Sequence, residues 1–111
     1  MDTKGSPCLG GLSDLKVADS KTLELCNAVK SKAEQVTRMN FNVFSPITYK
    51  DQVVGGMNYF IKAHVGEEEY VHLRVYEKLL CNGGTIELNG IQVSKTLEDE
   101  ILYFEQDIKS N

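Results

Sequence analysis

The side chains best suited to nucleophilic or acid–base chemistry are three cysteines and two histidines: Cys8, Cys26, Cys81, His64 and His72. A thiol enzyme needs a cysteine, a neighbouring base and a third group that orients the base. The spacing of these residues indicates no such arrangement. The two histidines are expected opposite each other on the outer face of adjacent strands, but two ligands fall short of the three or four that bind zinc. We therefore predict a non-enzyme without a catalytic residue, metal site or cofactor, in which His64 and His72 are a solvated pair.

Apolar side chains at turns of the chain indicate binding instead. Residues 52–56 read QVVGG, so Val53 and Val54 stand where most turns carry polar residues. The segments 8–11 (CLGG) and 79–84 (LLCNGG) also combine apolar side chains with glycine. Glycines in one turn usually only supply a positive φ. Three apolar segments at one end of a domain, however, form a rim typical of a docking surface.

The three segments meet only if the chain folds as one helix and an antiparallel sheet. A helix is predicted over residues 20–37, with Asp19 or Ser20 as its N-cap. Apolar residues recur along it at spacings of three and four and form one amphipathic stripe: Leu23, Leu25, Cys26, Val29, Ala33 and Val36. Three basic residues lie towards its far end, where the helix dipole favours cations: Lys30, Lys32 and Arg38.

The remainder of the chain reads as strands, at residues 41–50, 58–65, 70–79, 85–95 and 99–104. Pro46 indicates an edge or bulged strand, and the arm around Leu12 can supply a short additional strand. Successive antiparallel strands alternate in direction, so the turns at 52–56 and 79–84 fall at the same end of the sheet. The predicted class is α+β, with a single amphipathic helix packed across an antiparallel sheet of four to five strands.

The expected pairing of the second and third predicted strands places Ala63 and Val65 against Leu73 and Val71. Tyr103 and Phe104, in the last predicted strand, are expected to close the core. The chain is predicted to be a single domain over residues 1–111, with a flexible arm at 1–9 and a frayed tail at 105–111.

Composition excludes several classes of function. The 111 residues carry a net charge of −4 without a basic stripe, so no nucleic-acid partner is expected. No apolar run approaches the length of a membrane span, and the first residues lack the apolar core of a secretory signal, so no membrane partner is expected. An odd number of cysteines without CxxC spacing favours a reducing compartment, and we predict a cytoplasmic protein. Cys26 is expected in the core.

Several motifs, in order and at consistent separations, resemble one family. QVVGG at 52–56 resembles the Q-V-V-A-G hairpin of the cystatins. Four further segments resemble the stefins, the cytosolic, disulfide-free branch of that family: GGLSDLK at 10–16, VVGGMNYFIKAHVG at 53–66, YVHLRVYEKL at 70–79 and DEILYF at 99–104. The resemblance covers about residues 8 to 104.

The resemblance implies a tight, reversible, competitive inhibitor of papain-like cysteine proteases of the cathepsin L, B, H or S type. In this family a helix lies across a wrapped antiparallel sheet, and a wedge of the arm and two hairpins enters the active-site cleft of the protease. By matching position, Leu9 and Gly10 would lie along the non-primed subsites, and Leu79 and Leu80 would contact the primed side. The first hairpin would sit over the catalytic cysteine and histidine of the target with these residues: Gln52, Val53, Val54, Gly55 and Gly56.

The sequence departs from the family pattern at two positions. Members of the family are expected to carry alanine where Gly56 stands and proline where Leu80 stands. Two alternative functions remain open. One is a non-inhibitory interaction or scaffold protein with the same fold, which would form a domain-swapped dimer by straightening the turn at 53–55, although a monomer is expected. The other is a thiol enzyme that uses Cys8 or Cys81.

Overall fold

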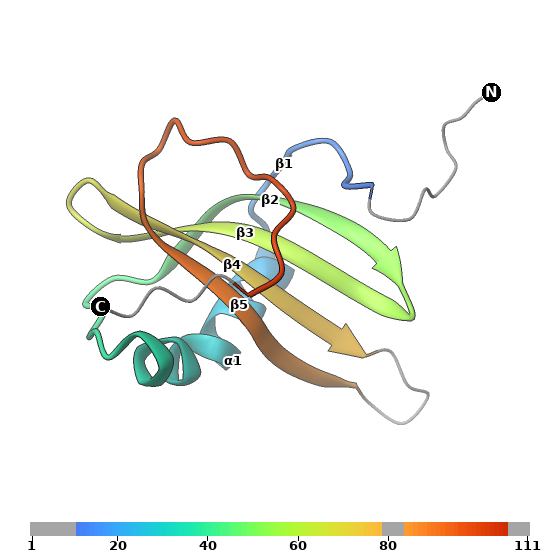
Figure 1. The fold of residues 1–111 in the computed structure, drawn as a ribbon, viewed down its shortest axis with the longest axis horizontal. Helices are drawn as coiled ribbons and strands as arrows, with labels where there is room; N and C mark the ends of the chain where they lie inside the picture. The colour runs from blue at the N-terminus through green and yellow to red at the C-terminus, as the bar shows by residue number, and fades with distance from the viewer. Residues whose placement is uncertain (1–10, 79–83, 107–111) are drawn as a thin grey trace.

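The computed structural model describes residues 11–78 and 84–106, which form one helix and a five-stranded antiparallel sheet (Figure 1). The strands lie in the order β1-β2-β3-β4-β5, so each pairs with the next strand in the chain. This arrangement confirms the predicted α+β class. The elements are β1 (Lys16–Val17), α1 (Ser20–Thr37), β2 (Ser45–Val54), β3 (Gly56–Gly66), β4 (Glu69–Lys78) and β5 (Thr85–Lys95).

The helix α1 begins and ends where the sequence predicted. Its N-cap is Asp19, whose carboxylate accepts a hydrogen bond from the Thr22 amide at 3.0 Å, while the Asp19 amide donates to the Thr22 hydroxyl at 2.8 Å. This reciprocal capping box satisfies two of the free amides at the helix start. At the other end Arg38 adopts a left-handed conformation and its amide donates to the Glu34 carbonyl. The last turn contains no basic residue, so of the three basic residues expected towards this end only Arg38, the C-cap, stands at it.

One face of the sheet packs against α1 and forms the main core. Leu23 was predicted in the apolar stripe but is 47% exposed. Cys26 is fully buried as expected, and burial raises the pKa of its thiol to about 12. The helix contributes Leu25, Cys26, Val29 and Ala33, and the sheet contributes Tyr49, Tyr59, Ile61, Ala63, Val65, Val71, Leu73, Val75 and Ile91.

Three strands, β3, β4 and β5, agree with the prediction, whereas β2 is shifted along the chain. β5 has the predicted bounds, and β3 and β4 lie within two residues of theirs. β2 runs from Ser45 to Val54, four residues later at each end than predicted, and the rings of Phe41 and Phe44 stack on each other before the strand starts. The pairing of β2 with β3 is irregular between Pro46 and Thr48, which confirms the predicted bulge.

The last predicted strand, residues 99–104, is wrong. Residues 96–106, which we call the strap, contain no strand and cross the face of the sheet opposite α1 (Figure 1). Buried Ile101 and Phe104 pack there against Phe60, whereas Tyr103 remains exposed. Apolar and polar residues alternate in this segment as they would in a strand, but here the apolar residues pack on a face of the sheet. The fifth strand is β1, which follows the predicted position at Leu12 by a few residues.

Side chains from the sheet hold the strap by its main-chain carbonyl groups. The Lys62 ammonium donates to the carbonyl oxygens of Leu97 and Asp99. Arg74 donates to the Phe104 carbonyl at 3.0 Å. The carbonyl of Gln106 accepts from a β5 amide at 3.1 Å, so the first two residues of the expected tail lie against β5, and residues 107–111 lie outside the described part.

The predicted pairing of β3 with β4 is wrong by two residues. Ala63 pairs with Val71, and His64 pairs with Tyr70. The shift arises at the turn, where the pairing is irregular between His64 and Gly66 and the backbone of Gly66 has a φ of 145°. The two histidines are therefore not opposite each other.

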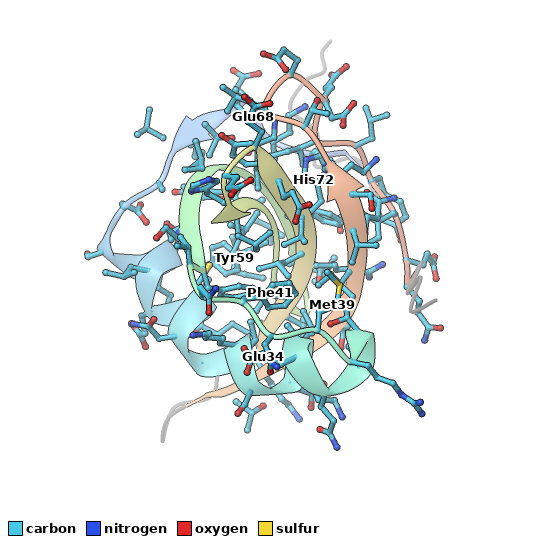
Figure 2. All side chains as sticks on the ribbon, turned by 90° about the vertical axis from the view of Figure 1, so that its left-hand side faces the viewer. Glu34, Met39, Phe41, Tyr59, Glu68 and His72 are labelled. Carbon is cyan, nitrogen blue, oxygen red and sulfur yellow. The ribbon has the colours of Figure 1, made fainter. Side chains whose placement is uncertain are left out.

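His72 is fully buried, so the predicted solvated histidine pair is also wrong. It pairs with Lys62 in the sheet, and Figure 2 shows its position in the molecule. Burial, with the nearby cations Lys62 and Lys95, lowers the pKa of His72 to about 4. His72 is thus a neutral core residue at neutral pH.

Candidate functional site

The turn between β2 and β3 presents two exposed apolar side chains. Val54 pairs with Gly56 in the register of this hairpin, so the turn closes around Gly55. Val53 is 71% exposed and Val54 is 39% exposed. We call residues 53–56 the tip. An apolar tip that no other part of the described chain covers can be buried by a partner at a gain of roughly 1.5–3 kcal/mol for a fully buried valine.

Gln52 lies beneath the tip as a brace. Its side chain is 5% exposed, and its amide oxygen accepts a hydrogen bond at 2.8 Å from the side-chain amide of Asn58, the residue opposite it on β3. A buried amide pair fixes the register of the two strands just before the turn, because shifting either strand would leave polar atoms unpaired. The resemblance placed Gln52 in the contact surface, whereas the structure directs its side chain into the protein.

The neighbouring strand β4 supports the tip from the side. The Tyr76 hydroxyl donates a hydrogen bond to the Gly55 carbonyl at 2.8 Å. Gly56 has a φ of +154°, and a Cβ atom there would lie 2.6 Å from the Glu77 carbonyl oxygen and 2.8 Å from the Tyr76 hydroxyl. Gly56 therefore permits a close approach between tip and β4 that a larger residue prevents.

The expected alanine position must be corrected. Aligned letter by letter with Gln52–Gly56, the motif Q-V-V-A-G has its alanine at Gly55 and its final glycine at Gly56. A Cβ atom at Gly55 would have no heavy atom within 4 Å, so this position has room for alanine. The chain thus departs from the motif at Gly55 and agrees with it at the position where glycine is required.

The second expected contact segment begins close to the same hairpin. Lys78 pairs with Thr85, so the connection from β4 to β5 starts and ends at adjacent positions at the end of the sheet that carries the tip (Figure 1). Glu77 is buried there and pairs with Lys21 of α1 at 2.7 Å, a contact that raises the Lys21 pKa. Leu79 and Leu80 themselves lie outside the described residues.

The segment that follows the arm, residues 11–16, is anchored at the base of the first hairpin. The Ser13 amide donates to the Asp51 carbonyl at 2.8 Å, and the Asp51 amide donates to the Ser13 hydroxyl at 2.9 Å. Lys16 pairs with the Asp51 carboxylate at 3.0 Å. Ser13 is thereby fixed beside Asp51, the residue that precedes Gln52. Leu9 and Gly10 lie outside the described residues.

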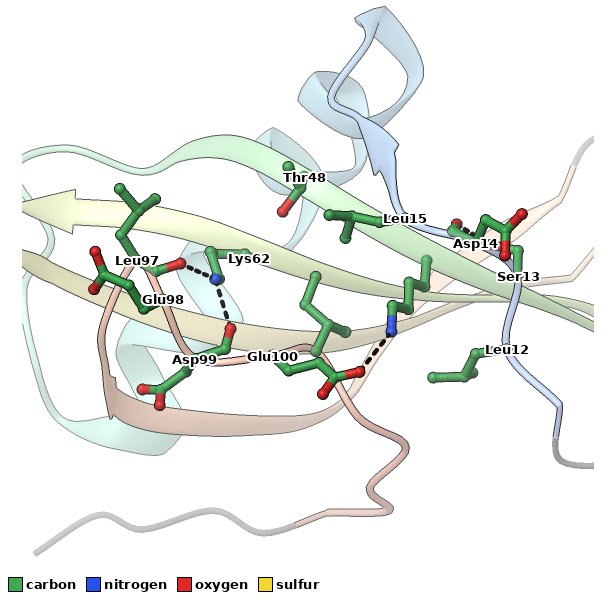
Figure 3. A pocket seen from close by; sticks show the side chains of 12 residues that line it. Leu12, Ser13, Asp14, Leu15, Thr48, Lys62, Leu97, Glu98, Asp99 and Glu100 are labelled. Atoms are coloured by element: carbon green, nitrogen blue, oxygen red, sulfur yellow. Dashed lines mark hydrogen bonds and ion pairs between the residues drawn. The ribbon is translucent and has the colours of Figure 1, made fainter.

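A groove of about 530 Å³ lies between the segment 12–15 and the strap (Figure 3). Both of its lysines are already engaged: Lys62 binds strap carbonyls, and Lys50 pairs with Glu100 at 3.5 Å. It contains none of the expected contact residues. Within residues 11–78 and 84–106, no three acidic, histidine or cysteine side chains are grouped as metal ligands. No helix in these ranges has the length and apolar character needed to cross a bilayer.

Comparison with known proteins agrees with this geometry. The model of the Cystatin domain matches residues 10–98. The chain belongs to the cystatin family. It is 50% identical to Cystatin-B of Oplegnathus fasciatus over 95 residues, which cover 86% of this chain and 95% of that protein. It is 41% identical to Leukocyte cysteine proteinase inhibitor 1 of Sus scrofa (86% and 92% covered) and 39% identical to Stefin-C of Bos taurus (88% and 97% covered).

These similarities identify a stefin-type cystatin, as the motifs predicted. Cystatins are inhibitors of proteases and do not catalyse a reaction, so the expectation of a non-enzyme is confirmed. Three residues that support the first hairpin of this cystatin were not predicted from the sequence. Ser13 precedes β1, Asp51 lies in β2 and Tyr76 lies in β4, and only the pairing of distant segments gives them their partners.

Proposed function

We propose that this cystatin is a tight, reversible, competitive inhibitor of papain-like cysteine proteases of the cathepsin L, B, H or S type. The single observation that carries the proposal is the tip, where Val53 is largely exposed although the backbone beneath it is firmly held. The name of a relative, Leukocyte cysteine proteinase inhibitor 1, supports the class of target.

A pre-formed tip suits this function because binding costs little conformational entropy. The buried Gln52–Asn58 pair orders the base of the hairpin before it meets a protease. The measured affinity reflects only the part of the contact free energy that exceeds the cost of ordering side chains and loops. An interface of ordinary size, about 800 Å² on each partner, reaches nanomolar affinity when its contacts are preorganised in this way.

We assign the contact residues by their places in the hairpin. Val53, Val54 and Gly55 would cover the catalytic cysteine and histidine of the protease, while Gln52 and Gly56 set the shape of the tip. Leu9 and Gly10 would occupy the non-primed subsites, and Leu79 and Leu80 the primed side. The anchored base of the arm, and the end of β4 beside the tip, support a wedge of three parts.

The test is a titration of papain and of a cathepsin L-type protease with the purified protein, following hydrolysis of a fluorogenic peptide. We expect stoichiometric loss of activity that recovers on dilution. Val53→Asp should weaken inhibition at least about 10-fold, equal to 1.4 kcal/mol, because it buries an unpaired charge in the cleft.

Val17→Asp is the matched control, because Val17 is equally exposed (79%) but lies on β1 opposite Thr48. Thr48 precedes Val53 by five residues, or about 17 Å of strand. We expect the Val17 variant to inhibit as well as the parent chain. Equal inhibition by both variants would contradict insertion of the tip, and no inhibition by the parent chain would contradict the function itself.

We also propose that the protein acts in the cytoplasm as a monomeric single domain, which its resemblance to the stefins supports. Size-exclusion chromatography with light scattering would test the oligomeric state. A dimer that converts to monomer on heating would instead favour the swapped form.

A further inference from the structure

The tip contains two consecutive glycines, the most flexible pair of residues that a turn can have. A Cβ atom added at Gly55 would have no heavy atom within 4 Å, so packing against neighbouring residues does not restrain this glycine. Each glycine has a larger range of backbone conformations than any other residue, and this freedom is lost when a partner fixes the tip. A tip of this composition needs a specific contact if it is to be ordered before binding.

The hydroxyl of Tyr76 supplies that contact. It donates to the carbonyl oxygen of Gly55 at 2.8 Å, which is the ordinary distance for a strong hydrogen bond between two oxygens. The Gly55 carbonyl belongs to the peptide that joins the two glycines, so this one bond fixes the plane of the most mobile peptide in the tip.

The backbone of Tyr76 is held from both sides of β4, where it pairs with Asn58 of β3 and Glu87 of β5. Asn58 in turn binds the buried amide of Gln52. The next residue, Glu77, forms a partly buried ion pair with Lys21 of α1. The base of the tyrosine is thus tied to the hairpin and to the helix, while its hydroxyl extends to the tip.

We propose that Tyr76 is a positioning residue of the inhibitor, which holds the Gly55–Gly56 peptide in the binding conformation before the protease arrives. The inference rests on the proposed function and adds a residue that acts through the tip. Without the hydroxyl, part of the population would have a misdirected tip, and the apparent affinity would fall in proportion to the competent fraction.

The test compares Tyr76→Phe with Tyr70→Phe. Both changes remove one hydroxyl from β4 and keep the ring, but Tyr70 lies at the opposite end of the strand, with its ring beside that of His64. Three quantities are measured for each variant: the free energy of unfolding in urea, the hydrogen exchange of the amides at positions 55–57 in the free protein, and the inhibition constant against papain.

We expect Tyr76→Phe to speed exchange at the tip and to raise the inhibition constant about 2- to 10-fold, the range that corresponds to one net hydrogen bond. Tyr70→Phe should change neither quantity. A raised inhibition constant with unchanged exchange would overturn the proposal, because Tyr76 would then be a contact of the protease and not a positioning residue. Unchanged exchange and unchanged inhibition would also overturn it.

The exchange measurement uses the free protein and does not depend on any protease. If the parent chain fails to inhibit papain, the proposed function fails while the exchange data still decide whether Tyr76 orders the tip. If the parent chain inhibits and Tyr76→Phe leaves the exchange unchanged, the positioning role fails and the proposed function stands.

Discussion

The two glycines of the tip should respond in opposite ways to the same change. Gly56→Ala places a methyl group 2.6 Å from the Glu77 carbonyl oxygen and 2.8 Å from the Tyr76 hydroxyl, at a φ of +154°. Gly55→Ala places the same methyl group where no atom lies within 4 Å, and its φ is not in the positive range. The pair is a matched experiment, since the residues are adjacent in one turn.

The magnitudes follow from these distances. A non-glycine residue in a sparsely populated backbone region costs about 1–3 kcal/mol. Relief of the contact with Glu77 requires movement of a main-chain carbonyl in β4, so we expect Gly56→Ala to destabilise the protein by a total of about 2–4 kcal/mol. Gly55→Ala should stabilise it by about 0.4–1 kcal/mol, because alanine restricts the unfolded chain without strain in the folded one.

Urea unfolding followed by circular dichroism measures both values. With a slope of about 1–3 kcal/mol per molar urea, the midpoint for Gly56→Ala should fall by roughly 1–3 M, and that for Gly55→Ala should rise slightly. Inhibition of papain is measured on the same samples, and the Gly56 variant should be the weaker inhibitor because its tip is displaced from β4.

A Gly56→Ala variant as stable as the parent chain would refute the reasoning. It would mean that the tip can move away from β4 at no cost, and the close approach at Gly56 would then have no energetic significance. A Gly55→Ala variant that lost more than about 1 kcal/mol would refute the other half, because strain would then exist where the structure has free space.

Two further predictions concern the strap and the sheet beneath it. Burial, opposed in part by Asp99, keeps the folded pKa of His72 near 4, below its unfolded value of about 6.5. Between about pH 6.5 and pH 4, the unfolded state therefore binds a proton that the folded state does not. Stability should therefore fall by about 2–3 kcal/mol from pH 7 to pH 4 in urea titrations. His72→Leu should remove most of this slope, and an unchanged slope would contradict the assignment. Lys62→Met should cost about 1–3 kcal/mol by leaving the carbonyls of Leu97 and Asp99 unpaired, and it should speed hydrogen exchange in the strap. A variant with unchanged stability and exchange would show that the ammonium does not hold the strap.

Local signals in the sequence were sufficient for the helix and most of the strands. Asp19 and Thr22 form the capping box that starts α1. The apolar stripe of the helix recurs at spacings of three and four, so both signals come from residues within a few positions of each other. Glycine and charged residues mark the turns, which places β3, β4 and β5 within two residues of their bounds. The exposed Val53 was also predictable, because a valine in a two-glycine turn has few neighbours to cover it.

Contacts between distant segments could not be predicted in this way. The register of β3 against β4 depends on the conformation at Gly66, and an error of two residues left the alternation of faces intact while it moved His64 away from His72. Whether an alternating segment forms a strand or crosses a sheet depends on hydrogen bonds that its own sequence does not contain. The strap obtains these from Lys62 and Arg74, which are distant in the chain.

The manner in which the strap is held has a consequence for how this protein can evolve. Four of the strap groups that accept hydrogen bonds from the sheet are the main-chain oxygens of Leu97, Asp99, Phe104 and Gln106, and every amino acid carries such an oxygen. Substitutions at Leu97, which is exposed and contributes its main-chain oxygen, should therefore be nearly neutral, and such positions can drift in sequence while the path of the strap is kept. Selection for that path acts instead on the donors of the sheet, far from the segment whose course they determine.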